Sequence, residues 1–378
     1  MISGDIGREK GLFGLFFSLY TISIVYLTAT TPLLPGEVKI LLSDSYTIGH
    51  LIASWVHRFT DEAFGIRAIF TLFGMVNLYL YYRLLSMRIS DGRDRLFVLT
   101  LYMILPGVLA SSVLVNDAVV AITLTLLFIL SYDGKATLSS YIALALLLFT
   151  DTAVMSLYLS LSIYLFFKKE YPLFIYSATL FILSLFMGSF TISGRPEGHF
   201  LELMGLYAAI FSPLMFIYFF YSLYRVAFQG DRDMLWYISF TALAVSMLLS
   251  VRQKISITDF SPYLLIGFVI AVEVYFGSMR VRMKRFGRGY RIAGGVVIST
   301  MAISSAILVF HHPLYRVLGN PHSFFVSKIY EPYDYMHSLP DSGADRCYDR
   351  ERISGRYRKV MEFYSIPQCG GESESGYR

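Results

Sequence analysis

Acidic side chains stand at the ends of hydrophobic stretches in this 378-residue chain. Glu37 follows the first long apolar stretch directly, and Asp44 comes seven residues later. Asp117 and Asp151 each lie in a short polar interval between two apolar stretches. A carboxylate beside an apolar surface can act as a general base with a raised pKa, or it can hold a divalent cation on phosphate oxygens. The same residues can be solvated loop acids, and Asp117 and Asp151 can cap the helices that follow.

Three basic residues share the side of the chain on which these acids are expected. Arg195 lies in the sequence SGRPEGHFLELMG, and Arg252 and Lys254 lie in SVRQKISITDFSPY. A basic residue at this interface can bind a phosphate or an anionic headgroup, with arginine as a bidentate donor. It can equally be an ordinary flank of an apolar stretch. We take the three residues as phosphate-binding candidates.

The composition shows what must position these residues. The chain is 55% hydrophobic and 16% charged, with mean hydropathy +0.56, whereas soluble proteins carry about 25% charged residues. Apolar residues arrive in long blocks over roughly residues 1–310, which excludes a soluble enzyme, a disordered chain and a fibrous protein. The net charge of +5 is modest and gives no reason to propose a nucleic-acid partner.

The apolar blocks predict an all-α polytopic membrane bundle with about eleven transmembrane helices. Two pairs of blocks must turn tightly at Asp117 and Asp151, because one long helix would bury an acid in lipid. The predicted spans are 11–29, 64–85, 96–115, 118–132, 137–150, 153–167, 172–190, 204–224, 234–250, 261–279 and 292–310.

The orientation follows from the distribution of lysine and arginine over the short loops. With the N-terminus inside, sixteen basic residues lie in the inside set and six in the outside set. This asymmetry predicts an N-inside, C-outside topology, which places all the acids named above outside. The expected location is the plasma (inner) membrane, with the functional face on the extracytoplasmic side.

The first outside loop is longer than a connector needs. Apolar residues at helical spacing in residues 45–59 predict an amphipathic helix that lies on the membrane, with Trp55 at the interface. His50, Ser54 and His57 occupy its other face, and we count His50 with Asp151 as further outer-face candidates.

Residues 311–378 form a small extracytoplasmic tail in this topology, separate from the transmembrane domain at 1–310. The chain has two cysteines, Cys347 and Cys369, and an oxidising compartment favours a disulfide between them. The tail is too small for a large core of its own, and residues 370–378 have the composition of a disordered end.

The order of these features resembles a family, the GT-C glycosyltransferases, in the branch of the protein O-mannosyltransferase-like and aminoarabinose-transferase-like enzymes. In that family an acid follows the first span and opens a long outer loop with interfacial helices, as Gly36-Glu37 and residues 45–59 do here. The segment AFGIRAIFTLFGMVNLYLYYRLL resembles the family's second span, with its arginine at the start. Pro106 in the third span and Asp117 before the fourth also fit. The later segments GHFLELMGLYAAIFSPLMFIYFFYSLYR and VRQKISITDFSPYLL extend the resemblance over roughly residues 11–280.

The resemblance implies a reaction in which a sugar moves from a polyprenyl-phosphate donor to an acceptor on the outer face, with inversion at the anomeric carbon. It implies Glu37 as the base, with Asp44 or Asp117 as alternatives, and Asp117 as a second acid that orients the acceptor or a metal. Arg195, Arg252 and Lys254 would stabilise the leaving phosphate. The acceptor can be a protein, a lipid or a glycan, and the participation of a divalent cation is left open.

Two other classes stay open from the residues alone. A transporter or flippase would also have many spans and buried acids, but it usually places ionisable groups near the midplane and shows internal repeats. A non-catalytic membrane assembly protein related to the GT-C enzymes is the other alternative, and Val38 favours it, because many members have a second acid at that position.

Overall fold

The chain folds as an all-helical bundle in the computed structural model, which describes residues 2–43, 46–132, 134, 136–150, 153–187, 198–281, 284–318, 327–340, 347–349, 353, 355 and 357–369. Within those residues the only β pairing is an isolated bridge between Tyr348 and Gln368. The helices are α1 (Ile2–Thr30), α2 (Pro35–Leu41), α3 (Ile48–His57), α4 (Ala63–Arg88), α5 (Gly92–Met103), α6 (Pro106–Val113), α7 (Asp117–Ser131), α8 (Leu138–Leu147), α9 (Val154–Lys168), α10 (Tyr171–Met187), α11 (Phe200–Phe211), α12 (Pro213–Gln229), α13 (Met234–Ser250), α14 (Ile257–Ile266), α15 (Phe268–Val281), α16 (Lys284–Val309), α17 (His311–Leu318), α18 (Ser327–Ser338) and α19 (Arg358–Phe363).

Apolar helices long enough to cross a membrane run through the bundle. Among the described residues, four helical stretches are long and apolar enough to cross a membrane. Two bent pairs of helices also are when each pair is counted as one span. Five shorter apolar helices, α7, α8, α9, α10 and α13, complete the set. Each predicted span falls on one of these elements, which supports a multi-pass membrane protein. The number of crossings and their direction stay predictions.

Two of the predicted spans are sharply bent, which the sequence interpretation did not anticipate. The stretch 96–115 divides into α5 and α6, which are bent by 63°, and 204–224 divides into α11 and α12, which are bent by 103°. Pro106 and Pro213 each stand at the first position of the second helix. Proline has no N–H to donate and clashes with the preceding turn, so each one starts a new helix.

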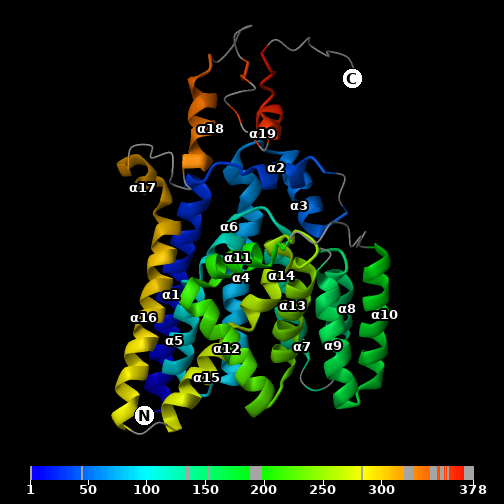
Figure 1. Ribbon diagram of the computed structural model, residues 1–378, viewed down its shortest axis with the longest axis vertical. Coiled ribbons are helices and arrows are strands. Elements are labelled where there is room, and N and C mark those ends of the chain that lie inside the picture. The colour runs from blue at the N-terminus through cyan, green and yellow to red at the C-terminus, as the bar shows by residue number, and fades with distance from the viewer. Residues whose placement is uncertain are drawn as a thin grey trace.

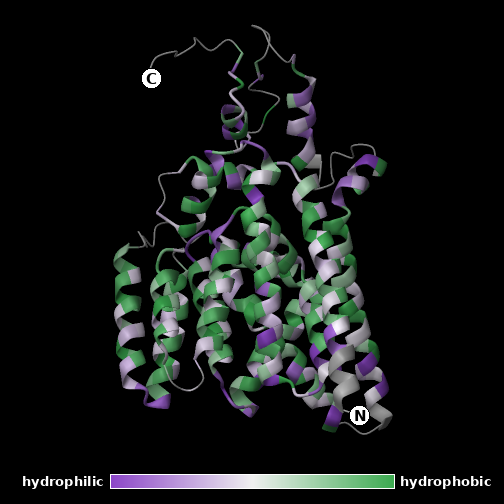
Figure 2. Ribbon diagram, turned by 180° about the vertical axis from the view of Figure 1, so that it is seen from behind, coloured by the Kyte–Doolittle hydropathy of each residue, from purple (hydrophilic) through white to green (hydrophobic). Residues whose placement is uncertain are grey.

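The elements form a bundle with a smaller layer on one end. α1 begins at the lower end of Figure 1, whereas α2, α3, α18 and α19 lie at the upper end. Hydrophobic residues dominate the middle of the bundle and hydrophilic residues gather toward both ends (Figure 2). α4 connects the first helices of the bundle, because it packs against α1, α3, α5, α6 and α7.

The first loop forms two helices where the sequence predicts one. The predicted helix at 45–59 is α3, and α2 precedes it. Its predicted apolar face divides: Val56 is buried against the bundle, whereas Leu51, Trp55 and Phe59 are exposed. These exposed side chains suit a helix lying at a membrane surface.

The described part of the tail packs on the first loop in a second hydrophobic core. Tyr333, Val360 and Met361 share this core with Leu33 and Val38. The Tyr333 hydroxyl donates to the Leu33 carbonyl oxygen, and α19 contacts α2. The tail thereby obtains from the first loop the apolar partners that it lacks by itself.

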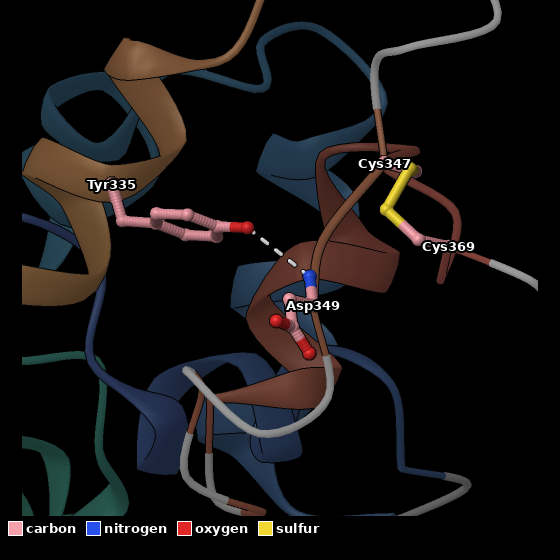
Figure 3. Close-up of a disulfide and its surroundings, with 4 residues drawn as sticks. All are labelled: Tyr335, Cys347, Asp349 and Cys369. Carbon is pink, nitrogen blue, oxygen red and sulfur yellow. Dashed lines mark hydrogen bonds between the residues drawn. A yellow bond between two sulfur atoms is a disulfide. The ribbon is translucent and has the colours of Figure 1, made fainter.

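Cys347 and Cys369 are joined in a disulfide, with their Cα atoms 4.9 Å apart. The bridge closes the segment that contains α19 (Figure 3). The Asp349 N–H donates to the Tyr335 hydroxyl at 3.1 Å, which ties this segment to α18. A disulfide that closes a loop of this length restricts the unfolded chain and stabilises the fold by about 3 kcal/mol.

We predict that the Cys347→Ser/Cys369→Ser variant loosens the first loop as well as the tail. Hydrogen–deuterium exchange of protein in nanodiscs should show faster exchange of backbone amides in both α19 and α2. Amides of α13, which is remote from the second core, serve as the internal control. Unchanged exchange in α2 beside faster exchange in α19 would contradict the shared core.

Candidate functional site

A buried ion pair joins the first loop to the centre of the bundle. Glu37 and Arg67 are 3% and 0% exposed, and they form a bidentate salt bridge. Arg67 Nε donates to Glu37 Oε1 at 2.8 Å, and Arg67 Nη2 donates to Oε2. The guanidinium also donates to the carbonyl oxygens of Thr31 and Pro32, directly after α1. Because Glu37 lies in α2, Arg67 holds both ends of the link between α1 and α2.

The hydrogen-bonding capacity of the Glu37 carboxylate is used up by these and two further contacts. The Leu34 N–H donates to Oε2 at 2.8 Å, and the Val115 N–H donates to Oε1 at 2.8 Å. An ionised carboxylate has about four lone-pair sites. Because four donors occupy them, Glu37 has no lone pair free to take a proton from an acceptor. Its role in this geometry is to fix α2 on α4 and on the segment that leads into α7.

Asp117 has a different environment, with free accepting capacity. It is the first residue of α7, directly after the N-cap Asn116, whose side chain accepts from the Val119 N–H. Asp117 Oδ1 accepts from the Gly49 N–H at 2.7 Å, at the start of α3. The carboxylate therefore lies at two helix N-termini, where partial positive charge favours an anion.

Gly49 is required for this approach. A Cβ at residue 49 would lie 2.5 Å from Asp117 Oδ1 and 3.3 Å from the backbone nitrogen of Asp117. Only a residue without a side chain lets the start of α3 come this close to the carboxylate. The glycine was not singled out by sequence reasoning, because its partner lies 68 residues away.

Burial raises the pKa of Asp117, at the N-terminal end of α7, to about 6. The hydrogen bonds from Gly49 and Thr47 oppose this shift, the charge of Asp259 adds to it, and His50 lowers the pKa. A carboxylate with this pKa is mostly ionised at neutral pH and yet basic enough to accept a proton.

Asp117 lines an open cavity of about 490 Å³ at the upper side of the bundle. The walls come from α2, from the segment between α6 and α7, and from the start of α14. Its polar side chains are those of Glu37, Lys39, Ser43, Asn116, Asp117, Ser256, Thr258 and Asp259. Lys39 is the one lysine or arginine among the described residues that line it, and its side chain is exposed.

Sequence reasoning missed Asp259 as a second cavity acid. It lies three residues after Ser256 at the start of α14, a spacing typical of a helix cap, and the Thr258 hydroxyl donates to its Oδ1 at 3.1 Å. Arg67 was expected at the start of the second span, but its pairing with Glu37 was not. Its position inside the apolar stretch AFGIRAIF was the available signal, since a charge there requires a buried partner.

The other predicted site residues that the structure describes do not line this cavity. Lys254 forms a salt bridge with Glu202, and Arg252 is exposed; neither lines the cavity. His50 Nδ1 donates to the Ile40 carbonyl oxygen at 2.7 Å and so connects α3 to α2. Asp44, Asp151 and Arg195 lie outside the described residues.

A metal site does not emerge from the described part of the chain, where no group of three His, Cys, Asp or Glu residues is arranged to hold an ion. Two acids, Asp117 and Asp259, line the cavity.

The comparisons with known proteins place the fold. No protein-family model matches the chain, and no curated protein matches it. The crystal structure of ArnT from Cupriavidus metallidurans bound to undecaprenyl phosphate is similar, with a TM-score of 0.56 and 10% identity, over 95% of this chain and 85% of that chain. The apo ArnT structure gives a TM-score of 0.53 and 11% identity, over 96% and 86% of the two chains.

The chain has a GT-C-like fold. The resemblance inferred from the order of sequence features is confirmed at this level, because the match extends over most of both chains. At 10% identity the likeness shows the GT-C-like architecture and leaves the chemistry to the residues of this chain.

We predict that Glu37→Gln lowers the free energy of unfolding by about 3–5 kcal/mol, because it leaves the buried Arg67 charge without a counter-ion. Arg67→Lys should also destabilise, since an ammonium cannot reproduce the bidentate fork. Denaturant unfolding of the purified protein in detergent, followed by circular dichroism, measures both effects.

Glu62→Gln is the matched control, because Glu62 belongs to the same loop and is exposed. A Glu37→Gln protein as stable as the Glu62→Gln protein would show that the ion pair does not hold the loop.

Proposed function

We propose that this chain is a membrane glycosyltransferase that moves a sugar from a polyprenyl-phosphate donor to an acceptor hydroxyl on the extracytoplasmic face. The observation that carries the proposal is the acid-lined cavity of a GT-C-like fold, with Asp117 as its ionised carboxylate. The similar ArnT structure was determined with undecaprenyl phosphate bound, which supports a lipid phosphate of that class as the ligand.

Asp117 is the base in this proposal, in place of Glu37. Its carboxylate receives one N–H from Gly49 at 2.7 Å and faces a cavity of about 490 Å³, whereas Glu37 is saturated by Arg67 and two backbone amides. Glu37 acts as a positioning residue, because it fixes α2 and the Val115 segment that form two walls of the cavity.

The reaction then follows in one displacement step. Asp117 takes the proton of the acceptor hydroxyl as the acceptor oxygen bonds to the anomeric carbon. The bond from that carbon to the donor phosphate breaks, with its electron pair leaving on the phosphate oxygen and the configuration inverting. The products are the glycosylated acceptor, polyprenyl phosphate and a protonated Asp117.

The leaving phosphate needs positive charge, because it gains a negative charge as the bond breaks. Lys39 is placed to supply it from the cavity wall. Arg195 and Arg252 remain candidates from the sequence, whereas Lys254 is already paired with Glu202. Asp259, which also lines the cavity, would hold a further hydroxyl of the acceptor.

We predict that Asp117→Asn abolishes transfer from a radiolabelled polyprenyl-phosphate sugar, measured with purified protein in lipid. Asp117→Asn removes the base, whereas Glu62→Gln in the same outer layer should keep wild-type turnover. In the wild type, kcat/KM should fall as the pH drops below about 6, because protonation of Asp117 removes the free base. Wild-type turnover by Asp117→Asn would refute the role of Asp117.

Gly49→Ala tests the positioning of the carboxylate without removing it. The added Cβ must displace Asp117 Oδ1 or the start of α3. We expect a loss of turnover of about 100-fold, which is typical of a 1 Å misplacement of a reacting group. Gly277→Ala, where a Cβ meets nothing within 4 Å, is the control. Equal turnover in the two alanine variants would contradict the assigned geometry.

A further inference from the structure

A second cavity, apart from the one that contains Asp117, lies between α16 and the helices α5, α12 and α15. It has a volume of about 100 Å³, and no residue lines both cavities. Its walls are apolar and aromatic side chains, with Phe97 from α5 and Val297 from α16 among them. Apolar cavities of this order stay dry and accept hydrocarbon.

The polar atoms at this cavity belong mainly to tyrosines that bond to one another. The hydroxyls of Tyr218 and Tyr290 are 2.8 Å apart, and the Tyr275 ring stacks on Tyr290 with centroids 5.1 Å apart. Gly294 lets α16 approach here, since a Cβ would lie 2.7 Å from the Tyr275 hydroxyl. Tyrosines in such an arrangement are typical of the zone where a hydrocarbon core meets headgroups.

α16 is the helix along which a lipid chain from the bilayer can enter this cavity. In the most apolar stretch of the span Gly287–Val309, only 11% of the residues are buried inside the protein. The corresponding share for Ala63–Arg88 is 44%. Ala293, one of the cavity residues on α16, has an exposed side chain. A lipid chain can therefore reach the cavity along α16 without opening the bundle.

Two arginines stand beside the tyrosines. Arg288 and Arg291 are three residues apart on α16, both side chains are exposed, and Arg291 lies within electrostatic range of Tyr275. They belong to a run of six basic residues between 280 and 291. Arginine binds phosphate through two parallel N–H donors, so this pair complements an anionic headgroup.

We propose that this cavity and the two arginines form a binding site for an anionic phospholipid. A segment of one acyl chain occupies the cavity beside Ala293 and Gly294, and the headgroup phosphate binds Arg288 and Arg291. The charge of the arginine run argues for an anionic lipid over a zwitterionic one, and the apolar walls argue for a chain over a soluble phosphate. This site is independent of the proposed transferase activity.

Native mass spectrometry of the full-length protein in mild detergent tests the proposal. The protein is titrated with phosphatidylglycerol and with phosphatidylcholine of the same acyl chains. We expect phosphatidylglycerol to bind about tenfold more tightly, from two arginines near the headgroup. Arg288→Gln/Arg291→Gln should bring the two affinities together, whereas Arg58→Gln, at an exposed position that ends α3, should leave their ratio unchanged.

A second variant tests the chain-binding part. Ala293→Phe fills the cavity and should weaken binding of both lipids, whereas Ala302→Phe, on an exposed position of α16 outside the cavity, should not. Equal affinity of the wild type for the two lipids would overturn the proposal. So would displacement of bound lipid by glycerol phosphate, which has no chain. Binding of polyprenyl phosphate that is tighter than that of phosphatidylglycerol and is lost in Ala293→Phe would also overturn it.

Discussion

The layer of α2, α3, α18 and α19 at the upper end of the molecule in Figure 1 depends on one buried ion pair. Glu37 and Arg67 are both almost fully withdrawn from solvent. The lone pairs that Glu37 does not use for Arg67 accept from the Leu34 and Val115 N–H groups, and the guanidinium also donates to the carbonyl oxygens of Thr31 and Pro32. Such additional hydrogen bonds are what makes a buried charge pair stable. The pair therefore dictates where α2 lies, and α2 in turn supports the tail and forms a wall of the cavity.

This constraint separates two acids that look equivalent in the sequence. Glu37 holds the architecture, because its lone pairs are occupied. Asp117 is placed by that architecture at two helix N-termini and beside a cavity, with burial raising its pKa to about 6. A fold that fixes one carboxylate rigidly can present another in a reactive state, which is the arrangement that proton transfer at neutral pH requires.

The sequence predicts the helices well and their contacts poorly, for physical reasons. Long apolar blocks are visible in the composition, and so are Asp117 and the cysteine pair. The break at Pro213 could have been inferred from proline chemistry, but hydropathy averages over it. The contacts of Arg67 with Glu37, of Gly49 with Asp117 and of Lys254 with Glu202 join residues 30, 68 and 52 positions apart, so only the packing of helices brings them together.

The most direct test is a cryo-electron microscopy structure of the protein in a lipid nanodisc with bound polyprenyl phosphate. The account predicts phosphate density in the cavity between Lys39 and Asp117, with the Glu37–Arg67 pair intact. Phosphate bound elsewhere would contradict it. So would a Glu37 carboxylate that has left Arg67 and turned toward the ligand, because the acid that we assign to the architecture would then belong to the chemistry.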